Sequence, residues 1–371
     1  MKKLKQILLL TVMALGAVFT SCTKEGPQGP PGADGTNGAD GTNGIDGTAG
    51  CISCHTNDSE LAIKTAQFEH SVHFTGGMEH VGYANYAGGS CSMCHSHNGF
   101  MQAVEQGTNH GGLHPEAAAM SCYTCHQVHT SYTREDYAMH YTDEVDLFLN
   151  ENSVFTGLMV DATNQYSDPE GMSNTCIKCH QPRHRGDGQP DPTKEGTMTI
   201  DERTASHWGP HYGAQGAIFG GVGGYVGLND PTVPSGTKGH HSCKSCHMSF
   251  NSLTGNYGEY VGGHSMKMAA TEGGDPVFTS CDECHSGRDA NIDLPGIMAA
   301  NKVLLEDLKE DLLTIPMIDE EGHLLAGTWT HQQLAAYWNF ALIKNDHSYG
   351  IHNSEYTQDL IMAAKTYLGT N

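Results

Sequence analysis

The chain has 371 residues, 37% of them hydrophobic, and carries 42 acidic against 19 basic residues for a formal net charge of −23. This acidic excess argues against nucleic acid as a partner, because nucleic-acid-binding domains present basic surfaces. It keeps a protein soluble and favours docking against cationic patches.

Residues 1–21 have the order of a secretory signal peptide, with the basic start MKKLK, an apolar run and small residues before Cys22. The run is too short to span a membrane comfortably. The stretch resembles a bacterial lipoprotein signal, in which the cysteine after the cleavage point carries the lipid. We therefore predict Cys22 as the membrane anchor of an exported outer-membrane lipoprotein that faces the periplasm or the cell surface. The alternative is an ordinary cleaved signal followed by an unpaired cysteine. Loss of the three lysines of the signal leaves 16 basic residues and a charge near −26.

Residues 22–50 are predicted to form a tether. Glycine occupies every third position from Gly26 to Gly50, nine in all, which is the collagen pattern. Such a composition cannot form a packed core. With prolines only at Pro27, Pro30 and Pro31, we favour an extended spacer, whose 25 residues from Gly26 to Gly50 reach roughly 75 to 80 Å at ~3.1 Å per residue. A trimeric stem, and with it a homo-oligomer, is the alternative.

Beyond the tether, cysteine occurs only in the pattern Cys-X-X-Cys-His, which recurs six times where composition alone predicts about 0.03 matches. Two thiols at this spacing can form thioethers to the two vinyl groups of one haem, and the adjacent histidine then lies under the iron. Zinc ribbons and disulfides also use paired cysteines, but neither explains a histidine after every second cysteine. We therefore predict six covalently attached haem c groups.

Numbered in chain order, motifs 1 to 6 are Cys51–His55, Cys91–His95, Cys122–His126, Cys176–His180, Cys243–His247 and Cys281–His285. The predicted thioether cysteines are Cys51, Cys54, Cys91, Cys94, Cys122, Cys125, Cys176, Cys179, Cys243, Cys246, Cys281 and Cys284. The predicted proximal ligands are His55, His95, His126, His180, His247 and His285.

The chain has 24 histidines, so eighteen remain for six second axial positions. Histidine suits a low-potential carrier better than methionine, which raises the potential. From sequence context, the predicted distal ligands are His73, His129, His211, His241, His264 and His352. His207 and His240 are close alternates to His211 and His241, and His70 is a weaker one to His73. The other candidates are His80, His97, His110, His114, His140, His184 and His347, whereas His323 and His331 are expected at the surface.

His129 follows His126 by only three residues and so lies on the proximal side of the motif-3 haem. It cannot easily cross the porphyrin plane to reach the other face of the same iron. We therefore predict that His129 ligates a neighbouring haem.

The fold class is predicted as mainly α with extensive loops, little β-sheet and haems in place of much of the core, in a hexahaem domain over residues 51–371. Leu304, Leu308 and Leu312 share one face of a predicted helix over 299–313, within a C-terminal helical segment over 299–371. A second helix is expected to run from Leu334 and close at Gly350, and Asn353 or Ser354 to cap a third. Residues 216–227 are interpreted either as a flexible loop or as glycines that let backbone approach a porphyrin.

Most of Cys51–Leu368 resembles the multihaem cytochrome c family that contains the pentahaem ammonia-forming nitrite reductase and many electron-transfer proteins. The resemblance rests on FEHSVHFTGG, CHSHNGF, CHQVH, HWGPHYGAQ, GGHSMKM and the C-terminal AAYWNFALIKNDHSYGIHNSEYTQDLIMAAKTYL. It implies haems packed in an array and long helices that contact haems or pair protomers. Many nitrite-reducing relatives use a Cys-X-X-Cys-Lys motif, which this chain lacks.

The leading interpretation is an electron carrier of the cell envelope or cell surface, exchanging electrons with redox proteins there or with acceptors outside the cell. The alternative is a multihaem oxidoreductase that acts on a small nitrogen or sulfur compound at one open haem. Tyr212, Arg183 and Arg203 could serve such chemistry, although packing and propionate pairing are their more ordinary roles.

Overall fold

A computed structural model describes residues 54–55, 59–75, 91–108, 112, 114, 117–143, 145–146, 148, 165–166, 172–186, 188–227, 243–249, 261–269, 281 and 293–370. All of them belong to one compact unit, Asp46–Asn371. The predicted signal, the tether and Cys22 lie outside the described residues. In the described part of the chain, no helix has both the length and the apolar character needed to cross a membrane.

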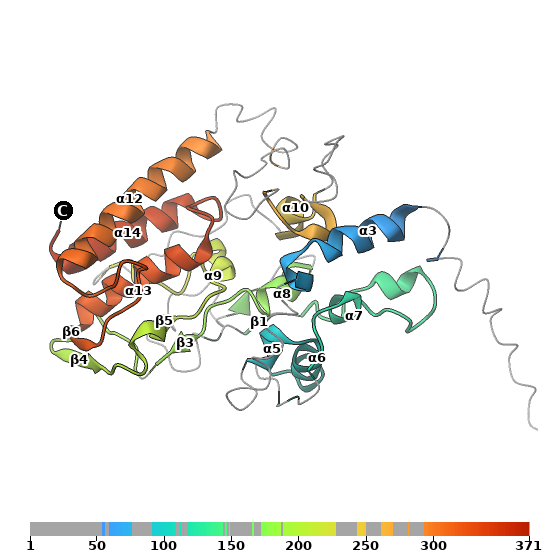
Figure 1. Ribbon diagram of the computed structural model, residues 1–371, viewed down its shortest axis with the longest axis horizontal. Coiled ribbons are helices and arrows are strands. Elements are labelled where there is room, and N and C mark those ends of the chain that lie inside the picture. The colour runs from blue at the N-terminus through green and yellow to red at the C-terminus, as the bar shows by residue number, and fades with distance from the viewer. Residues whose placement is uncertain are drawn as a thin grey trace, which may run out of the picture. The chain divides into compact units, whose positions relative to one another are not determined.

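The described elements are mostly helical (Figure 1). The α-helices are α3 (Ser59–Glu69), α5 (Ser92–His95), α6 (His97–Gln106), α7 (Cys122–Cys125), α8 (Met172–Ile177), α9 (Gln215–Gly220), α10 (Cys243–His247), α12 (Leu294–Thr314), α13 (His331–Asp346) and α14 (Ser354–Leu368). Three 3-10 helices are η3 (Arg134–Tyr137), η5 (Ala205–His207) and η6 (Gly263–Ser265). The described strands form three antiparallel pairs: β1 (Val145–Asp146) with β2 (Gln165–Tyr166), β3 (His184–Arg185) with β5 (Gly209–Pro210), and β4 (Thr197–Ile200) with β6 (Gly327–Thr330). The prediction of a mainly α fold with little sheet and C-terminal helices is confirmed.

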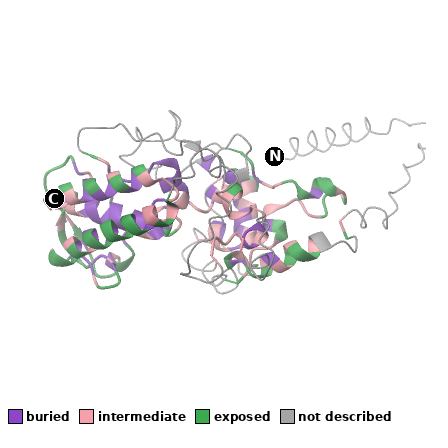
Figure 2. Ribbon diagram, turned by 90° about the horizontal axis from the view of Figure 1, so that it is seen from above, coloured by how far each residue is buried: buried purple, intermediate pink, exposed green. Residues whose placement is uncertain are grey.

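The C-terminal helices α12, α13 and α14 pack on one another and hold the largest part of the core. Helix α13 is buried almost all round from Leu334 to Ile343, because α12, α14, α9 and β5 surround it. Its Trp338 is fully buried and donates to the backbone carbonyl of Gly223 at 2.7 Å. Figure 2 shows buried residues along these helices and a mixture of buried and intermediate residues around the short motif helices.

Two predicted helix boundaries differ from the structure. Helix α12 begins at Leu294, five residues before the predicted start, because Asp293 caps it by accepting from the backbone N–H of Gly296 at 2.9 Å. Helix α13 ends at Asp346 rather than at Gly350, since His347 adopts the left-handed conformation with φ 61°. The predicted cap of α14 is correct: the Asn353 side chain accepts from the Tyr356 N–H at 3.1 Å.

The glycine-rich segment 216–227 is not a flexible loop. At two of its glycines, the close neighbour is another part of the protein rather than a porphyrin. Its first part is helix α9, and residues 216–225 are buried. A Cβ on Gly216 would lie 2.6 Å from the carbonyl oxygen of His180, and one on Gly224 would lie 2.3 Å from Leu360. These glycines are therefore needed where protein backbone packs against motif 4 and against α14.

Candidate functional site

The motifs that the structure describes fold as single helical turns. The backbone N–H of the motif histidine donates to the carbonyl of the first cysteine, at 3.1 Å in motif 2, 2.9 Å in motif 3 and 2.8 Å in motif 4. Residues at positions i, i+3 and i+4 of a helix lie on one face. Each turn therefore presents two thiols and an imidazole in the same direction.

Four of the predicted distal histidines lie beside a motif histidine from a distant part of the chain, with the two ring planes inclined by 38–79°. The ring centres are 6.2 Å apart for His55 and His129, 6.2 Å for His126 and His264, 6.1 Å for His247 and His352, and 5.8 Å for His73 and His180. Each pair combines one histidine of a Cys-X-X-Cys-His motif with one from another segment.

These spacings fit a metal ion held between the rings. An imidazole nitrogen lies about 2.0 Å from a bound first-row metal and about 1.1 Å from its own ring centre, so two rings on opposite sides of one ion have centres about 6.2 Å apart. Three pairs have this separation to within 0.1 Å, and His73 with His180 is slightly closer. The donor set, with two cysteines beside one ring of each pair, fits a covalently attached haem.

His211 lies near the histidine of motif 2. Burial, the charges of Arg183 and Arg185, and then His95 lower the pKa of His211 to about 3. The alternate ligand His207 lies on η5 and is exposed, whereas His211 is half-buried. Of the two candidates, His211 therefore has the surroundings of a buried neutral ligand. Pro210, expected to fix a turn here, instead forms strand β5 with Gly209.

The Nδ1 atoms of three motif histidines are held by oxygen acceptors. His126 donates to the backbone carbonyl of Tyr137 at 2.7 Å, His247 to that of Met266 at 3.0 Å, and His180 to the side-chain carbonyl of Gln215 at 3.1 Å. Because each acceptor requires a proton on Nδ1, the neutral ring keeps its lone pair on Nε2. That tautomer is the one that can bind a metal through Nε2.

Burial keeps the rings of His73 and His264 in the neutral form. Burial and the neighbouring His180 and His247 lower the pKa of His73 to about 4, and burial with His126 lowers that of His264 to about 4. His129 contacts two tyrosines: the Tyr123 hydroxyl is 2.9 Å from its Nδ1, and the Tyr132 ring stacks on it at 5.6 Å. A neutral imidazole is the form that ligates a metal.

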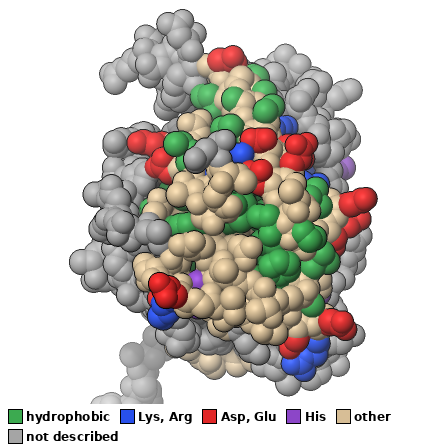
Figure 3. All heavy atoms as spheres, turned by 90° about the vertical axis from the view of Figure 1, so that its left-hand side faces the viewer, with side chains coloured by type: hydrophobic (Ala, Val, Ile, Leu, Met, Phe, Trp, Pro, Cys, Tyr) green, Lys and Arg blue, Asp and Glu red, His purple; other side chains and the backbone are tan. Residues whose placement is uncertain are grey.

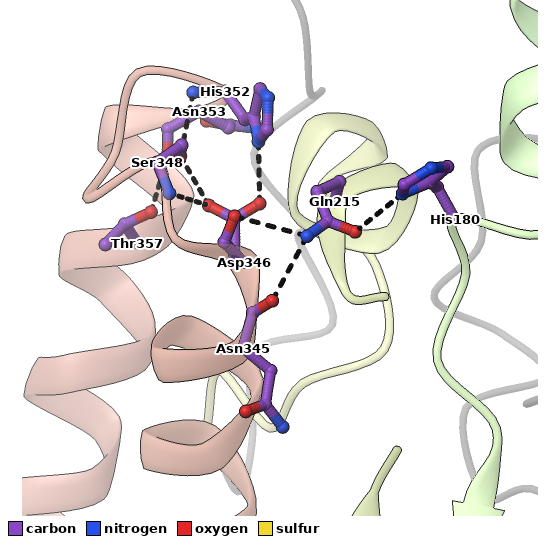
Figure 4. Close-up of polar contacts among 8 residues, drawn as sticks. All are labelled: His180, Gln215, Asn345, Asp346, Ser348, His352, Asn353 and Thr357. Atoms are coloured by element: carbon purple, nitrogen blue, oxygen red, sulfur yellow. Dashed lines mark hydrogen bonds and ion pairs between the residues drawn. The ribbon is translucent and has the colours of Figure 1, made fainter. Parts of the chain in front are cut away.

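His352 differs from the others because its Nδ1 pairs with a carboxylate, Asp346 Oδ1, at 2.6 Å. Burial alone would lower the pKa of His352, but the charge of Asp346 and this hydrogen bond raise it. Figure 4 shows Asp346 at the end of α13 between His352 and Gln215. The Gln215 amide donates to the carbonyls of Asn345 at 3.2 Å and Asp346 at 3.5 Å, and its own carbonyl accepts from His180. A polar chain thus connects the histidine pairs of motifs 4 and 5.

The cysteines bring several motifs into contact. The thiol of Cys94 in motif 2 hydrogen-bonds that of Cys179 in motif 4, and each sulfur also approaches the other segment's backbone, at 3.9 Å from the Cys179 carbonyl and 3.6 Å from the Met93 carbonyl. The thiol of Cys176 in motif 4 hydrogen-bonds that of Cys243 in motif 5. Motif 4 therefore lies between motifs 2 and 5.

Motif 3 is joined to its neighbours by single short segments. Residues 126–129 carry both the motif-3 histidine and the partner of His55. The segment around η6 carries His264, which lies beside His126, and Met266, whose carbonyl accepts from His247 of motif 5.

The disulfide interpretation would pair Cys91 with Cys94 in motif 2 and Cys122 with Cys125 in motif 3. None of these four cysteines is in a disulfide bond.

The remaining histidines have other surroundings. His184 packs against Trp208 and Trp338, with ring centres 5.7 and 5.3 Å away. His97 contacts the Thr124 hydroxyl at 3.1 Å, and His114 the Gln102 side chain at 3.0 Å. His347 is the C-cap residue that follows α13. Burial lowers the pKa of His140. His323 and His331 were expected at the surface, but both are half-buried. Nδ1 of His331 accepts from the Asp191 N–H at 3.1 Å.

Several predicted residues lie outside the described residues: Cys51, Cys284, His285, His241, His240, His80 and His110. The structure therefore does not describe the second ligand of motif 6. Of the arginines and tyrosine considered for substrate chemistry, Arg183 donates to Cys91 Sγ at 3.6 Å, Arg203 is exposed, and Tyr212 is exposed beside His211 at 5.5 Å between ring centres.

Sequence reasoning missed Asp346, Gln215 and Tyr123 as partners of the histidines. A weak signal for Asp346 was available, because it is an acidic residue at the end of an apolar helix that closes just before a candidate ligand. Gln215 and Tyr123 have no comparable signal, since their partners come from tertiary packing.

No protein-family model matches the sequence, and no curated protein matches it. Two solved structures are similar in backbone. The outer cell wall cytochrome OcwA has 17% sequence identity and a TM-score of 0.48 over 82% of this chain and 50% of its own. An undecahaem cytochrome from the S-layer of Carboxydothermus ferrireducens has 15% identity and a TM-score of 0.41 over 81% of this chain and 40% of its own. The chain thus spans half or less of the length of either structure.

Proposed function

We propose that the protein transfers electrons through six covalently attached haem c groups. The observation that carries this proposal is the set of opposed histidine rings, whose centres lie 5.8–6.2 Å apart beside paired cysteines. When bound, each haem iron supplies reversible one-electron chemistry. The two cysteines of each motif would hold the porphyrin by thioethers, and a motif histidine and a distal histidine would ligate the iron.

Two histidines on one iron leave no position for a substrate, so they favour electron transfer over catalysis. The proposed pairs are His55 with His129, His95 with His211, His126 with His264, His180 with His73, and His247 with His352. For motif 6, the proposed ligands are His285 and His241, by sequence context alone. The competing function, a reductase or oxidase, requires at least one haem with an open face.

The contacts between motifs support a branched route. Motif 4 touches motif 2 through Cys94 and Cys179 and motif 5 through Cys176 and Cys243, and Cys125 of motif 3 lies near both motif-4 cysteines. Motif 3 shares segments with motifs 1 and 5. We therefore place motif 4 at a junction, with motifs 2 and 5 on separate arms and motif 1 reached through motif 3.

The proposed setting is the cell envelope, with Cys22 as lipid anchor and residues 22–50 as a spacer. The partners would be redox proteins of the envelope or acceptors outside the cell, and not nucleic acid. The net charge of −23 favours a partner with a cationic docking patch. Figure 3 shows acidic side chains around the margin of one face of the molecule, with hydrophobic side chains near its centre and few basic ones.

The test is haem quantitation combined with electron paramagnetic resonance on the protein expressed with haem-maturation machinery. Six haems per chain, all low-spin, are expected. One stoichiometric high-spin haem that binds small ligands would favour the oxidoreductase instead, and a colourless protein would exclude both functions.

A further inference from the structure

Asp346 gives His352 a different kind of partner from those of three motif histidines whose Nδ1 contacts the structure describes. His126 and His247 donate from Nδ1 to backbone carbonyls, and His180 donates to a side-chain amide. These acceptors are neutral. His352 donates instead to the carboxylate of Asp346, at 2.6 Å (Figure 4). Charge-assisted hydrogen bonds of this kind are roughly twice as strong as neutral ones.

The position of this carboxylate requires a partner for its charge. Its side chain is only 1% exposed, and burying a charge is costly unless it is paired. It is also the last residue of α13, where the partial negative charge of the helix end disfavours an anion. A purely structural residue at such a place would more ordinarily be a cation or a neutral cap.

The surroundings of Asp346 fix the direction of its carboxylate. Oδ2 accepts from the Ser348 hydroxyl and from the Ser348 N–H at 3.3 Å, which leaves Oδ1 directed at His352. The Ser348 hydroxyl oxygen in turn accepts from the His352 N–H at 3.2 Å. The bend between α13 and α14 therefore holds the carboxylate and the imidazole in one geometry.

We propose that Asp346 is a positioning residue that sets the reduction potential of the motif-5 haem below those of the haems whose ligands donate to neutral acceptors. The proposal rests on the proposed function, with His247 and His352 as axial ligands. A carboxylate that pulls on the Nδ1 proton makes Nε2 a stronger electron donor and so stabilises ferric over ferrous iron. The buried negative charge acts in the same direction.

This potential has a consequence for the direction of electron flow. Motif 5 lies beside motif 4, through the Cys176–Cys243 contact and the chain from Gln215 to Asp346. An electron that enters at the motif-5 haem would pass to motif 4 with a favourable change in free energy. The motif-5 arm is therefore the entry side of the junction.

The test is a potentiometric titration, followed by electron paramagnetic resonance, of the haem-loaded protein and its Asp346→Asn variant. Asparagine keeps the shape of the side chain and removes its charge. The oxidised-to-reduced ratio of one haem should change by about tenfold at a given potential, an upward shift of about 59 mV for a one-electron couple. The other five haems should not shift.

The matched control is Asp319→Asn. Asp319 also pairs with a histidine, His323, at 3.2 Å, but this pair is partly exposed and belongs to no proposed haem. The control removes the same charge and should shift no haem. A shift in Asp346→Asn no larger than that in Asp319→Asn would overturn the proposal.

Ser348→Ala provides an independent test should Asp346→Asn fail to load haem. It keeps the carboxylate and removes a hydroxyl that donates to it, so Asp346 should pull more strongly on His352 and the potential of the same haem should fall. An unchanged or raised potential contradicts the proposal. Loss of the low-spin haems in the unmodified protein would refute the proposed function, whereas six low-spin haems without these shifts refute only the role of Asp346.

Discussion

His129→Ala tests the pairing of haem ligands most directly, because it separates a residue's place in the sequence from its place in space. His129 lies three residues after His126, yet its ring faces His55 of motif 1 at 6.2 Å. Its backbone has φ 60°, in the left-handed region, so the chain turns sharply at this position. Alanine should therefore open the motif-1 haem and leave the motif-3 haem with both ligands.

The magnitude follows from the stoichiometry. One of six proposed haems would lose one axial ligand, so about one sixth of the haem should become high-spin and bind carbon monoxide. The lost contacts with Tyr123 and Tyr132 lie at an exposed site, so the fold should be retained. Electron paramagnetic resonance and optical titration with carbon monoxide measure the fraction.

A triple variant identifies which haem has changed. Adding Cys51→Ala and Cys54→Ala, which remove the motif-1 haem, should abolish the new high-spin signal, whereas Cys122→Ala with Cys125→Ala should leave it. His97→Ala, at a histidine that contacts Thr124 rather than a motif histidine, is the control and should give no high-spin haem. A high-spin signal that disappears with the motif-3 haem would refute the pairing.

The helices were predictable where local rules determine them, and less so where packing does. The capping of α14 by Asn353 depends on a side chain and an N–H three residues apart, so sequence alone was sufficient. The end of α13 was misplaced because Gly350 was interpreted as the closing residue, while His347 takes the left-handed conformation three residues earlier. Asn and His can adopt that conformation, although glycine is the usual residue.

The glycine-rich segment 216–227 was misread for a different reason. Glycine lacks a side chain both where a chain is mobile and where two backbones must touch, and composition cannot separate these cases. Here the carbonyl of His180 and the side chain of Leu360 occupy the space that a Cβ would need. That information lies in residues far away in the sequence.

The motifs themselves were evident from sequence because their chemistry is local, within five residues. The pairing of histidines is not local: His126 and His264, or His247 and His352, meet only after the chain has folded. Sequence context was enough to name candidate ligands, and five of the six lie beside a motif histidine in the structure. The motif that each candidate approaches could be identified only from the folded chain. Axial ligation itself stays a proposal. Asp346 was missed because an acidic residue at a helix end reads as solvated, and its burial depends on α9 and on the following bend.

Three further variants test the packing and the junction. Gly216→Ala should destabilise the protein and disturb the motif-4 haem, because its Cβ would meet a carbonyl 2.6 Å away, whereas Gly227→Ala, with open space around it, should not; thermal unfolding and the Soret spectrum report both. Trp338→Ala should lower the free energy of unfolding by about 3–5 kcal/mol in a denaturant titration, since it removes a fully buried ring and its hydrogen bond. Cys176→Ala with Cys179→Ala, which removes the motif-4 haem, tests the junction. Because these two cysteines touch motifs 5 and 2, their haem is the link between the arms, and electron exchange between the five remaining haems should slow sharply after mixing with a substoichiometric reductant. If five haems are loaded and still equilibrate at the original rate, the electrons pass by another route and motif 4 is not the junction.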